Sequence, residues 1–233
     1  MYRYETHLHT APVSKCARAD VRNHLGFYKE MGYDGVFITN HFLDGNLNAD
    51  KKLPYWDLIE FYFSDYEEAK RLSSEYDIKV FSGVELSYGG TDFLIYGLDK
   101  EWYLSNPEIM EMKKSQELAL MMSSGALVIQ AHPYREASYI DHIRLFPRCV
   151  HGVEIINAAQ PQFINDMARH YADSYELIHF AGSDNHSGFK CKRLAGMEFE
   201  TPVSDELDFV AKVLAKEGST FYFEPLQDKE ESL

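Results

Sequence analysis

Short apolar runs alternate along the chain with longer stretches in which apolar and polar residues mix at helical spacing. The runs predict seven strands, the first ending near residues 4–7 and the others at residues 35–39, 79–84, 92–96, 126–130, 152–156 and 177–181. The mixed stretches predict helices at residues 19–31, 57–75, 107–123 and 161–173, and a last helix capped by Ser204 that runs to residue 216. Strands that alternate with helices are typical of parallel βαβ units.

Polar side chains stand just past the ends of these predicted strands. They are His7 and His9, His41, Glu85, His132, Asn157, and Asp184 with His186. In a closed parallel barrel all strand ends share the face that holds the active site, whereas an open sheet gathers ligands mainly at one switch point. Polar residues after nearly every strand therefore favour an α/β barrel.

Composition narrows the class of protein. The 233 residues carry 23 basic and 37 acidic side chains, a formal net charge of −14, which disfavours extended contact with nucleic acid. A hydrophobic content of 45% excludes a disordered chain, and the absence of repeats and linkers favours one domain over residues 1–233.

The location of the protein is predicted from three absences in the sequence. No run approaches the roughly 18 apolar residues that a membrane helix needs. The first residues lack the apolar core of a signal peptide, and the three cysteines form no CxxC pair. We therefore expect a cytoplasmic protein without a membrane segment; the sequence carries no signal for an oligomeric state.

His7 and His9 form an HxH pair. In an extended segment residues i and i+2 point to the same side, so both imidazoles can reach one ion. Alone the pair is a weak signal, and the alternative is two surface histidines. The signal strengthens because His41, Glu85, His132 and the pair Asp184 and His186 each follow another apolar run.

Five short motifs occur in order along the chain, and together they resemble a known family. The motifs are HLHT at residues 7–10, TNH at 39–41, GVE at 83–85, AHP at 131–133 and GSDNH at 182–186. They are similar to those of PHP-domain proteins (the polymerase and histidinol phosphatase superfamily), especially the small stand-alone phosphoesterases. The resemblance implies a distorted seven-stranded (β/α) TIM-like barrel, two or three divalent ions and metal-assisted hydrolysis of phosphate esters.

The resemblance also implies the ligands. His7, His9, Glu85 and Asp184 would hold one ion, Glu85 would bridge to a second ion held by His132, and His41 and His186 would hold a third. Imidazole and carboxylate donors together suit zinc, manganese or iron. Such ions activate a water as hydroxide and stabilise charge on the phosphoryl oxygens. Glu85, Asp184 and His186 are thus the expected catalytic residues, and His186 or His41 is a candidate proton donor if it holds no ion.

The sequence departs from the family pattern at two positions. Many members have a histidine where this chain has Asp92; a hairpin turn at Gly89-Gly90 would pair Glu85 with Leu94 and turn Asp92 to the side of Glu85. Asp92 is therefore either a replacement ligand or a solvated turn residue. Many members also carry an acidic or histidine ligand soon after HxH. Here Ser14 or Lys15 stands in its place. Cys16, the next residue, is a candidate thiolate ligand, and Asp20 is a further candidate that stands far into the following helix.

Three arginines are candidates for binding the substrate phosphate, because a guanidinium clamps phosphate with two hydrogen bonds. Arg135 is the first choice, Arg193 lies near Lys190 and Lys192, and Arg18 follows the HxH loop; each is alternatively a surface residue. The other five histidines, namely His24, His142, His151, His170 and His179, have ordinary positions in or beside predicted helices and strands.

The sequence thus predicts a metal-dependent phosphoesterase that acts on a small phosphorylated substrate, a nucleotide or a phosphometabolite. Histidinol-phosphate phosphatase is the nearest alternative, followed by a phosphotyrosine-protein phosphatase and a nuclease, which the negative charge disfavours. A non-catalytic metal- or ligand-binding module and a hydrolase of C–N bonds are the remaining alternatives. The C–N hydrolase is disfavoured because no lysine is clearly placed to bridge two ions.

Overall fold

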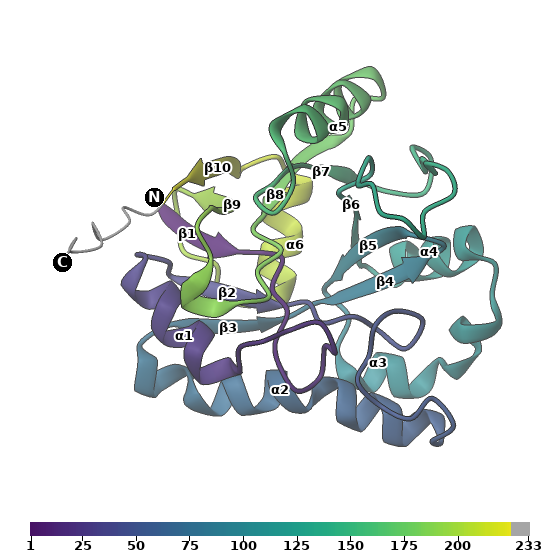
Figure 1. The fold of residues 1–233 in the computed structure, drawn as a ribbon, viewed down its shortest axis with the longest axis horizontal. Coiled ribbons are helices and arrows are strands. Elements are labelled where there is room, and N and C mark those ends of the chain that lie inside the picture. Colours follow the sequence, from purple (N-terminus) through teal and green to yellow (C-terminus); the bar gives the residue numbers. More distant parts are fainter. Residues whose placement is uncertain (225–233) are drawn as a thin grey trace.

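The computed structural model describes residues 1–224, whose strands form two mixed five-stranded sheets (Figure 1). The first sheet has, in spatial order, β10 (Ser219–Phe223), β9 (Leu194–Phe199), β1 (Tyr2–Glu5), β2 (Gly35–Ile38) and β3 (Lys79–Ser82). The second has β4 (Val84–Tyr88), β5 (Thr91–Tyr96), β6 (Leu127–Ala131), β7 (Gly152–Asn157) and β8 (Ile178–Gly182).

The prediction of a seven-stranded (β/α) barrel is wrong, although the α/β class is right. Neither sheet closes on itself, and in the described part of the chain the sheets are joined through two isolated parallel bridges, Leu8 to Asn185 and His41 to Glu85. The cause is antiparallel pairing: β5 runs against both β4 and β6, and β9 runs against both β1 and β10. These strands interrupt the uniform series of parallel βαβ units that a closed parallel barrel requires.

The hairpin between β4 and β5 has the predicted register. Gly89 and Gly90 have φ values of +56° and +86°, which suit a tight two-residue turn. Glu85 lies opposite Leu94, and Asp92 lies opposite Ser87, two residues after Glu85. Because side chains alternate along a strand, Asp92 and Glu85 share one face, as the sequence predicts.

Six α-helices are described around the sheets, with two short 3₁₀ helices. They are α1 (Val21–Glu30), α2 (Tyr55–Tyr76), α3 (Lys100–Ser105), α4 (Lys114–Ser123), α5 (Gln162–Ser174) and α6 (Glu206–Leu214), with η1 (Pro107–Glu111) and η2 (Gly188–Lys190). The predicted helix at residues 107–123 is in fact η1 and α4. Asp205, not Ser204, caps α6 by accepting a hydrogen bond from the amide of Asp208.

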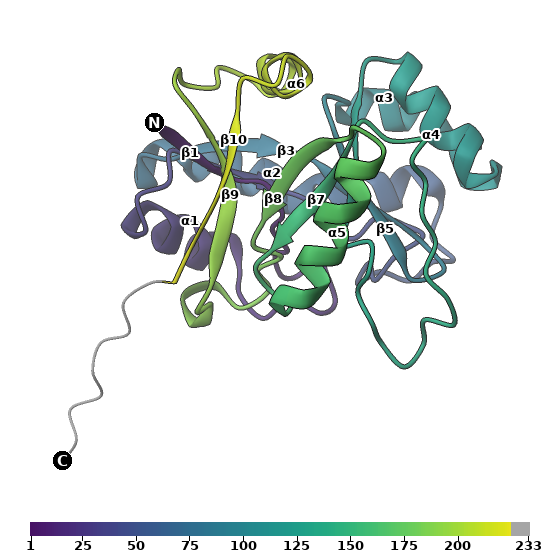
Figure 2. The ribbon, with the colours of Figure 1, turned by 90° about the horizontal axis from the view of Figure 1, so that it is seen from above.

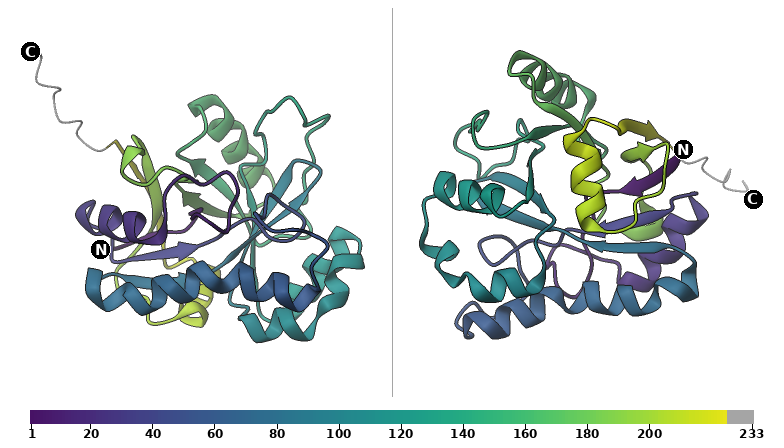
Figure 3. Two further views of the ribbon diagram at one scale, coloured as in Figure 1. Left: turned by 60° about the horizontal axis from the view of Figure 1, so that its bottom comes forward. Right: turned by 180° about the vertical axis from the view of Figure 1, so that it is seen from behind.

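Helix α2 packs along both sheets (Figures 1 and 3). Its first half contributes Ile59 and Phe63 to a core shared with β4 and β5, and its second half contributes Ala69 and Leu72 to a core shared with β2 and β3. Figure 2 shows α5 along β7 on the other side of the molecule. In residues 1–224 none of the helices has the length and hydropathy of a membrane-spanning segment.

A third core fills the space between the sheets. It contains Phe37 of β2, Tyr96 of β5, Phe180 of β8 and Phe209 of α6, and the Phe37 and Phe209 rings lie 4.2 Å apart. Burying such aromatic side chains is a large source of stability. This core holds the strands so that the polar residues beyond their carboxyl ends meet at one place.

Candidate metal centre

The histidines and carboxylates predicted as ligands come together in three overlapping groups. Within each group the donor atoms lie within 4.8 Å of one another. The groups are His7, His9 and Asp184; His7, Glu85 and His132; and His9, His41 and His186. The first sheet supplies His7, His9 and His41, and the second sheet supplies the other residues.

His7 and His9 point to the same side, and both are fully buried. Leu8 between them pairs with Asn185, and the amide of His9 donates to the Asn185 carbonyl at 3.1 Å. This pairing holds the segment extended, so the alternative of two surface histidines is wrong. Their ring centroids lie 5.2 Å apart.

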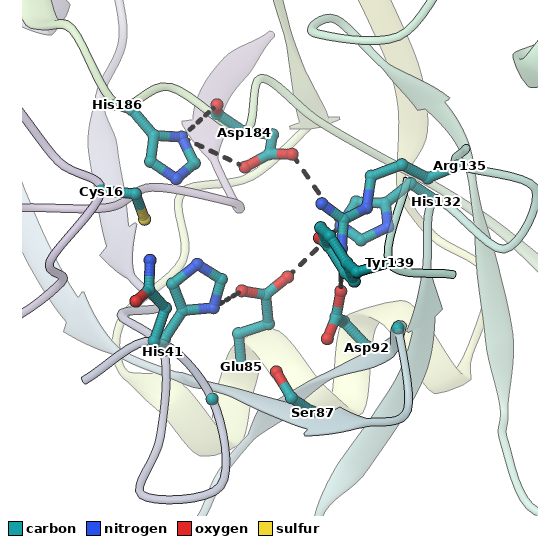
Figure 4. Close-up of a pocket in the computed structure, with 13 residues that line it drawn as sticks. Cys16, His41, Glu85, Ser87, Asp92, His132, Arg135, Tyr139, Asp184 and His186 are labelled. Atoms are coloured by element: carbon teal, nitrogen blue, oxygen red, sulfur yellow. Dashed lines mark hydrogen bonds and ion pairs between the residues drawn. The ribbon is translucent and has the colours of Figure 1, made fainter. Parts of the chain in front are cut away.

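Glu85 lies at the centre of the cluster (Figure 4). Its Oε1 is 3.2 Å from His7 Nε2 and 3.3 Å from His132 Nε2. Its Oε2 is 3.4 Å from His9 Nε2 and 2.6 Å from His41 Nδ1. Both oxygens of this carboxylate therefore face imidazole nitrogens from the ends of several strands.

Asp184 closes the other side of the cluster. Its Oδ1 is 3.3 Å from His9 Nε2 and 3.6 Å from His7 Nε2. Asp184 has a φ of +53° and His132 a φ of +25°, in the region that residues other than glycine rarely adopt. Such strained backbone is concentrated at functional sites.

The two carboxylates of the cluster are held ionised, and His9 is held neutral. Burial raises the pKa of Glu85, but the charges of His41, His7 and His9 outweigh it and hold the pKa well below its usual range. The pKa of Asp184 is likewise low, because His7 and other histidines outweigh its burial. Burial, and then the charges of His186 and His41, lower the pKa of His9 and keep it neutral. Burial lowers the pKa of His7, His41 and His132, but the neighbouring carboxylates outweigh it and raise the pKa. Metals bind neutral imidazoles, so cation binding would release protons from these histidines.

Several buried polar atoms at this centre make no hydrogen bond. Among them are His7 Nε2, His9 Nε2, Glu85 Oε2 and Asp184 Oδ1. They lie within 3.6 Å of one another in several pairs but lack hydrogen-bond geometry. Buried polar groups without partners are rare and costly, so this arrangement fits residues that hold divalent cations.

Glu154 of β7 supports the cluster from behind, and sequence reasoning missed it. It is fully buried; Oε1 accepts from His7 Nδ1 at 2.9 Å, and Oε2 accepts from the amide of His132 at 3.0 Å. A carboxylate on the outer nitrogen fixes the orientation and tautomer of a ligand histidine. The available signal was a charged residue inside an otherwise apolar strand, which requires a partner.

Glu5 holds the backbone of the same region. Its Oε1 accepts from the amides of His7 and Ser183 at 2.8 and 2.9 Å, tying the end of β1 to the end of β8. Burial raises the pKa of Glu5 to about 7, although the hydrogen bonds with Ser183 and His7 act in the opposite direction. Glu5 therefore fixes the position of the HxH segment.

The segment after HxH lies against His41 and His186. Ser14 Oγ lies 3.2 Å from His9 Nδ1 and accepts from the amide of His41, so Ser14 orients ligands. Burial raises the pKa of the Cys16 thiol, but hydrogen bonds with His186 and His41 outweigh it and lower the pKa to about 6. Asp20 lies away from the cluster as the N-cap of α1, and Lys15 is exposed.

A cavity of about 510 Å³ opens over the cluster (Figure 4). Arg135 lines it and donates to Asp92 at 2.9 Å, while Tyr139 covers the guanidinium with its ring centroid 5.8 Å away. Asp92 is 3% exposed, so the alternative of a solvated turn residue is wrong. Its Oδ2 lies 3.9 Å from His132 Nε2, close to the cluster but outside the three groups.

The other two predicted substrate arginines lie outside the lining of this cavity. Arg193 reaches the carbonyls of Ala159 and Gln160 at 3.4 Å, and Arg18 is exposed, with only its amide bonded to the His186 carbonyl. The five histidines given ordinary positions are all absent from the three donor groups of the described chain.

No family model matches the sequence, and no curated protein matches it. Solved structures do match. A two-domain protein from Bacteroides vulgatus that contains a predicted PHP-like metal-dependent phosphoesterase aligns with a TM-score of 0.67 and 14% identity, over 94% of this chain and 64% of its own. This chain therefore spans about two thirds of that protein.

Two further structures give similar alignments. A candidate metal-dependent phosphoesterase from Bifidobacterium adolescentis aligns with a TM-score of 0.57 and 13% identity, over 91% of this chain and 96% of its own. The lesion-specific endonuclease PfuEndoQ from Pyrococcus furiosus aligns with a TM-score of 0.53 and 12% identity. The alignment covers 92% of this chain and 56% of the endonuclease. At these identities the likeness establishes the fold alone: the chain shares its fold with solved structures described as PHP-like metal-dependent phosphoesterases, the family that the motifs resemble.

Proposed function

We propose that this protein is a metal-dependent phosphoesterase of the PHP type that hydrolyses a small phosphorylated substrate. The observation that carries the proposal is that three donor groups overlap through His7 and His9 around Glu85 and Asp184, in a cavity that also contains Arg135. A volume of about 510 Å³ is in the range of small-molecule sites.

Divalent ions bound here would supply Lewis acidity, activating water and neutralising charge on the phosphoryl group. His7, His9, Glu85 and Asp184 would hold one ion, Glu85 and His132 a second, and His41 and His186 a third. Glu154 would keep His7 in the tautomer with its Nε2 lone pair toward the ion. Arg135, held by Asp92, would bind the substrate phosphate.

His186 lies on the open side of the cluster, with its side chain 27% exposed. Its Nδ1 lies 2.9 Å from the Asp184 carbonyl, and Figure 4 shows its other nitrogen facing the cavity. In a protein with two ions, this nitrogen would be free to donate a proton to the leaving oxygen. With three ions, it is a ligand.

The proposed class of substrate follows from the net charge of the protein and from the charge that bound cations would give the cavity. The net charge of −14 disfavours a long polyanion, whereas bound cations would make the cavity itself attractive to one phosphate. A nucleotide or phosphometabolite is the leading class, and histidinol phosphate is the nearest alternative. The same fold occurs in an endonuclease and in an amidohydrolase; no lysine lines the cavity, which disfavours the C–N hydrolase alternative.

The direct test is phosphate release by metal-loaded protein. Protein reconstituted with Mn²⁺ or Zn²⁺ should hydrolyse an aryl phosphate and one or more members of a panel of nucleotides, sugar phosphates and histidinol phosphate. A chelator should remove both the ions and the activity, and added metal should restore both. A fully metallated sample with no turnover on any phosphate ester would favour the non-catalytic module instead.

Arg135→Ala should raise KM about 10- to 100-fold, because a charge-assisted hydrogen bond to phosphate contributes about 1.5–3 kcal/mol. Metal content should not change. Steady-state kinetics with metal analysis measures both, and Arg148→Ala is the control, since Arg148 is exposed and does not line the cavity.

Asp92→Asn tests whether Asp92 only holds Arg135 or also binds an ion. As the partner of Arg135 alone it should affect KM without loss of metal, whereas a ligand role should lower the number of ions per chain. An unchanged KM in Arg135→Ala would contradict the assignment of Arg135.

A further inference from the structure

We propose that Cys16 completes the third ion site with His41 and His186, giving this site one sulfur and two nitrogen donors and a preference for zinc-like ions over manganese. The inference rests on the proposed metal binding at this cavity and concerns the chain's departure from the family pattern after HxH. It assigns the missing donor to a thiolate.

The first step is a count of donor atoms. His9 has one free nitrogen, Nε2, because Nδ1 lies 3.2 Å from Ser14 Oγ. That Nε2 is 3.3 Å from Asp184 and 3.4 Å from Glu85, which places it with the first ion. An imidazole nitrogen binds one ion, so His9 cannot also serve the third site. His41 and His186 alone leave that site two donors, fewer than a stable zinc site uses.

The second step is the placement of Cys16. The backbone is fixed on both sides of it: the amide of Lys15 donates to the Asn46 carbonyl at 3.0 Å, and the amide of Arg18 donates to the His186 carbonyl at 2.7 Å. Cys16 lines the cavity, and Figure 4 shows its sulfur between the rings of His41 and His186. The two imidazoles influence the thiol, although the sulfur lies outside the three groups whose donor atoms are within 4.8 Å of one another.

The third step is the state of the neighbouring donors. His41 Nδ1 is buried and makes no hydrogen bond, although it is only 2.6 Å from Glu85 Oε2. A buried imidazole nitrogen without a partner points to a ligand that the imidazole is placed to bind. His41, one of the two imidazoles beside Cys16, is therefore not satisfied by the protein alone.

The fourth step is selectivity. Thiolate is a soft donor that suits zinc, cobalt and iron, whereas manganese prefers oxygen. Catalytic zinc sites use three protein ligands, among them histidine and cysteine, and keep a fourth position open. The third site should therefore differ in preference from the first two, which contain carboxylates.

Cobalt substitution tests the assignment without using turnover. The wild-type protein loaded with Co²⁺ should show a near-ultraviolet thiolate-to-cobalt charge-transfer band. Cys16→Ser should lose the band and bind one ion fewer per chain at the same free Co²⁺. Cys149→Ser and Cys191→Ser are matched controls that should keep the band, since the described chain has its other two cysteines outside the cavity.

Cys16→Asp guards against a folding defect in the serine variant. It should bind three ions without the band and accept Mn²⁺ in the third site. A wild-type protein without the band, or a band that persists in Cys16→Ser, would overturn the inference. A band in a protein with no phosphoesterase turnover would support the Cys16 assignment and contradict the proposed function. Turnover without a band would support the proposed function and contradict the Cys16 assignment.

Discussion

Glu85→Gln should lower turnover by about 10³-fold, the largest single effect expected in this protein. The amide keeps the shape of the carboxylate but cannot neutralise two cations, and it would place a donor NH₂ against imidazoles that need an anionic neighbour. Glu85 lies within 3.4 Å of nitrogens from His7, His9, His41 and His132, so the loss affects more than one ion. Kinetics and metal analysis of the same sample measure the result.

Glu117→Gln is the matched control for a buried carboxylate. Glu117 is 3% exposed and pairs with Lys114, away from the cluster. This variant should lose some thermal stability and keep its ions and its turnover per folded molecule. If Glu85→Gln retained a full complement of ions, Glu85 would not be a bridging ligand.

Glu154→Gln should weaken metal binding about 10- to 100-fold, although Glu154 is not proposed to touch an ion. The neutral amide removes the charge that faces His7 Nδ1, and a single amide oxygen cannot accept from both His7 and the amide of His132. Metal affinity measured by chelator competition gives the size of the effect, and Glu117→Gln is again the control.

If Glu154 acts only by positioning His7, a second result is expected for Glu154→Gln. At saturating metal most of the lost turnover should return, because the ligands themselves remain. Unchanged metal affinity would mean that His7 keeps its orientation without Glu154. Turnover that stays low at full metal occupancy would instead place Glu154 in the reaction itself.

The positions of the ligand histidines were predictable because they depend on local geometry. Alternation along a strand places His7 and His9 on one side, and a two-residue glycine turn fixes Asp92 relative to Glu85. Each of these relations involves residues within about ten positions of one another, so the sequence alone determines them.

The parts that failed depend on contacts between distant residues. Nothing local shows that β9 returns to pair with β1 in the opposite direction, with Tyr2 facing Phe199, so the strand was missed and the barrel was wrongly expected. Arg193 and Arg135 are both loop arginines in sequence, and only the fold shows that Arg135 meets Asp92. For Glu154 the sequence signals only a charge that needs a partner, and the fold shows that the partner is His7.

The two bridges that join the sheets have a consequence for rigidity. Leu8 lies between His7 and His9, and the other bridge pairs His41 with Glu85, so the joints between the sheets are also the ligand segments. An ion held by His7, His9 and Glu85 would be a further cross-link between the two sheets, beside these backbone bridges and the aromatic core. After ion release, the contact between the two sheets should open locally before the hydrophobic cores unfold. The metal centre would thus stabilise the contact between the two sheets as well as carry out the reaction.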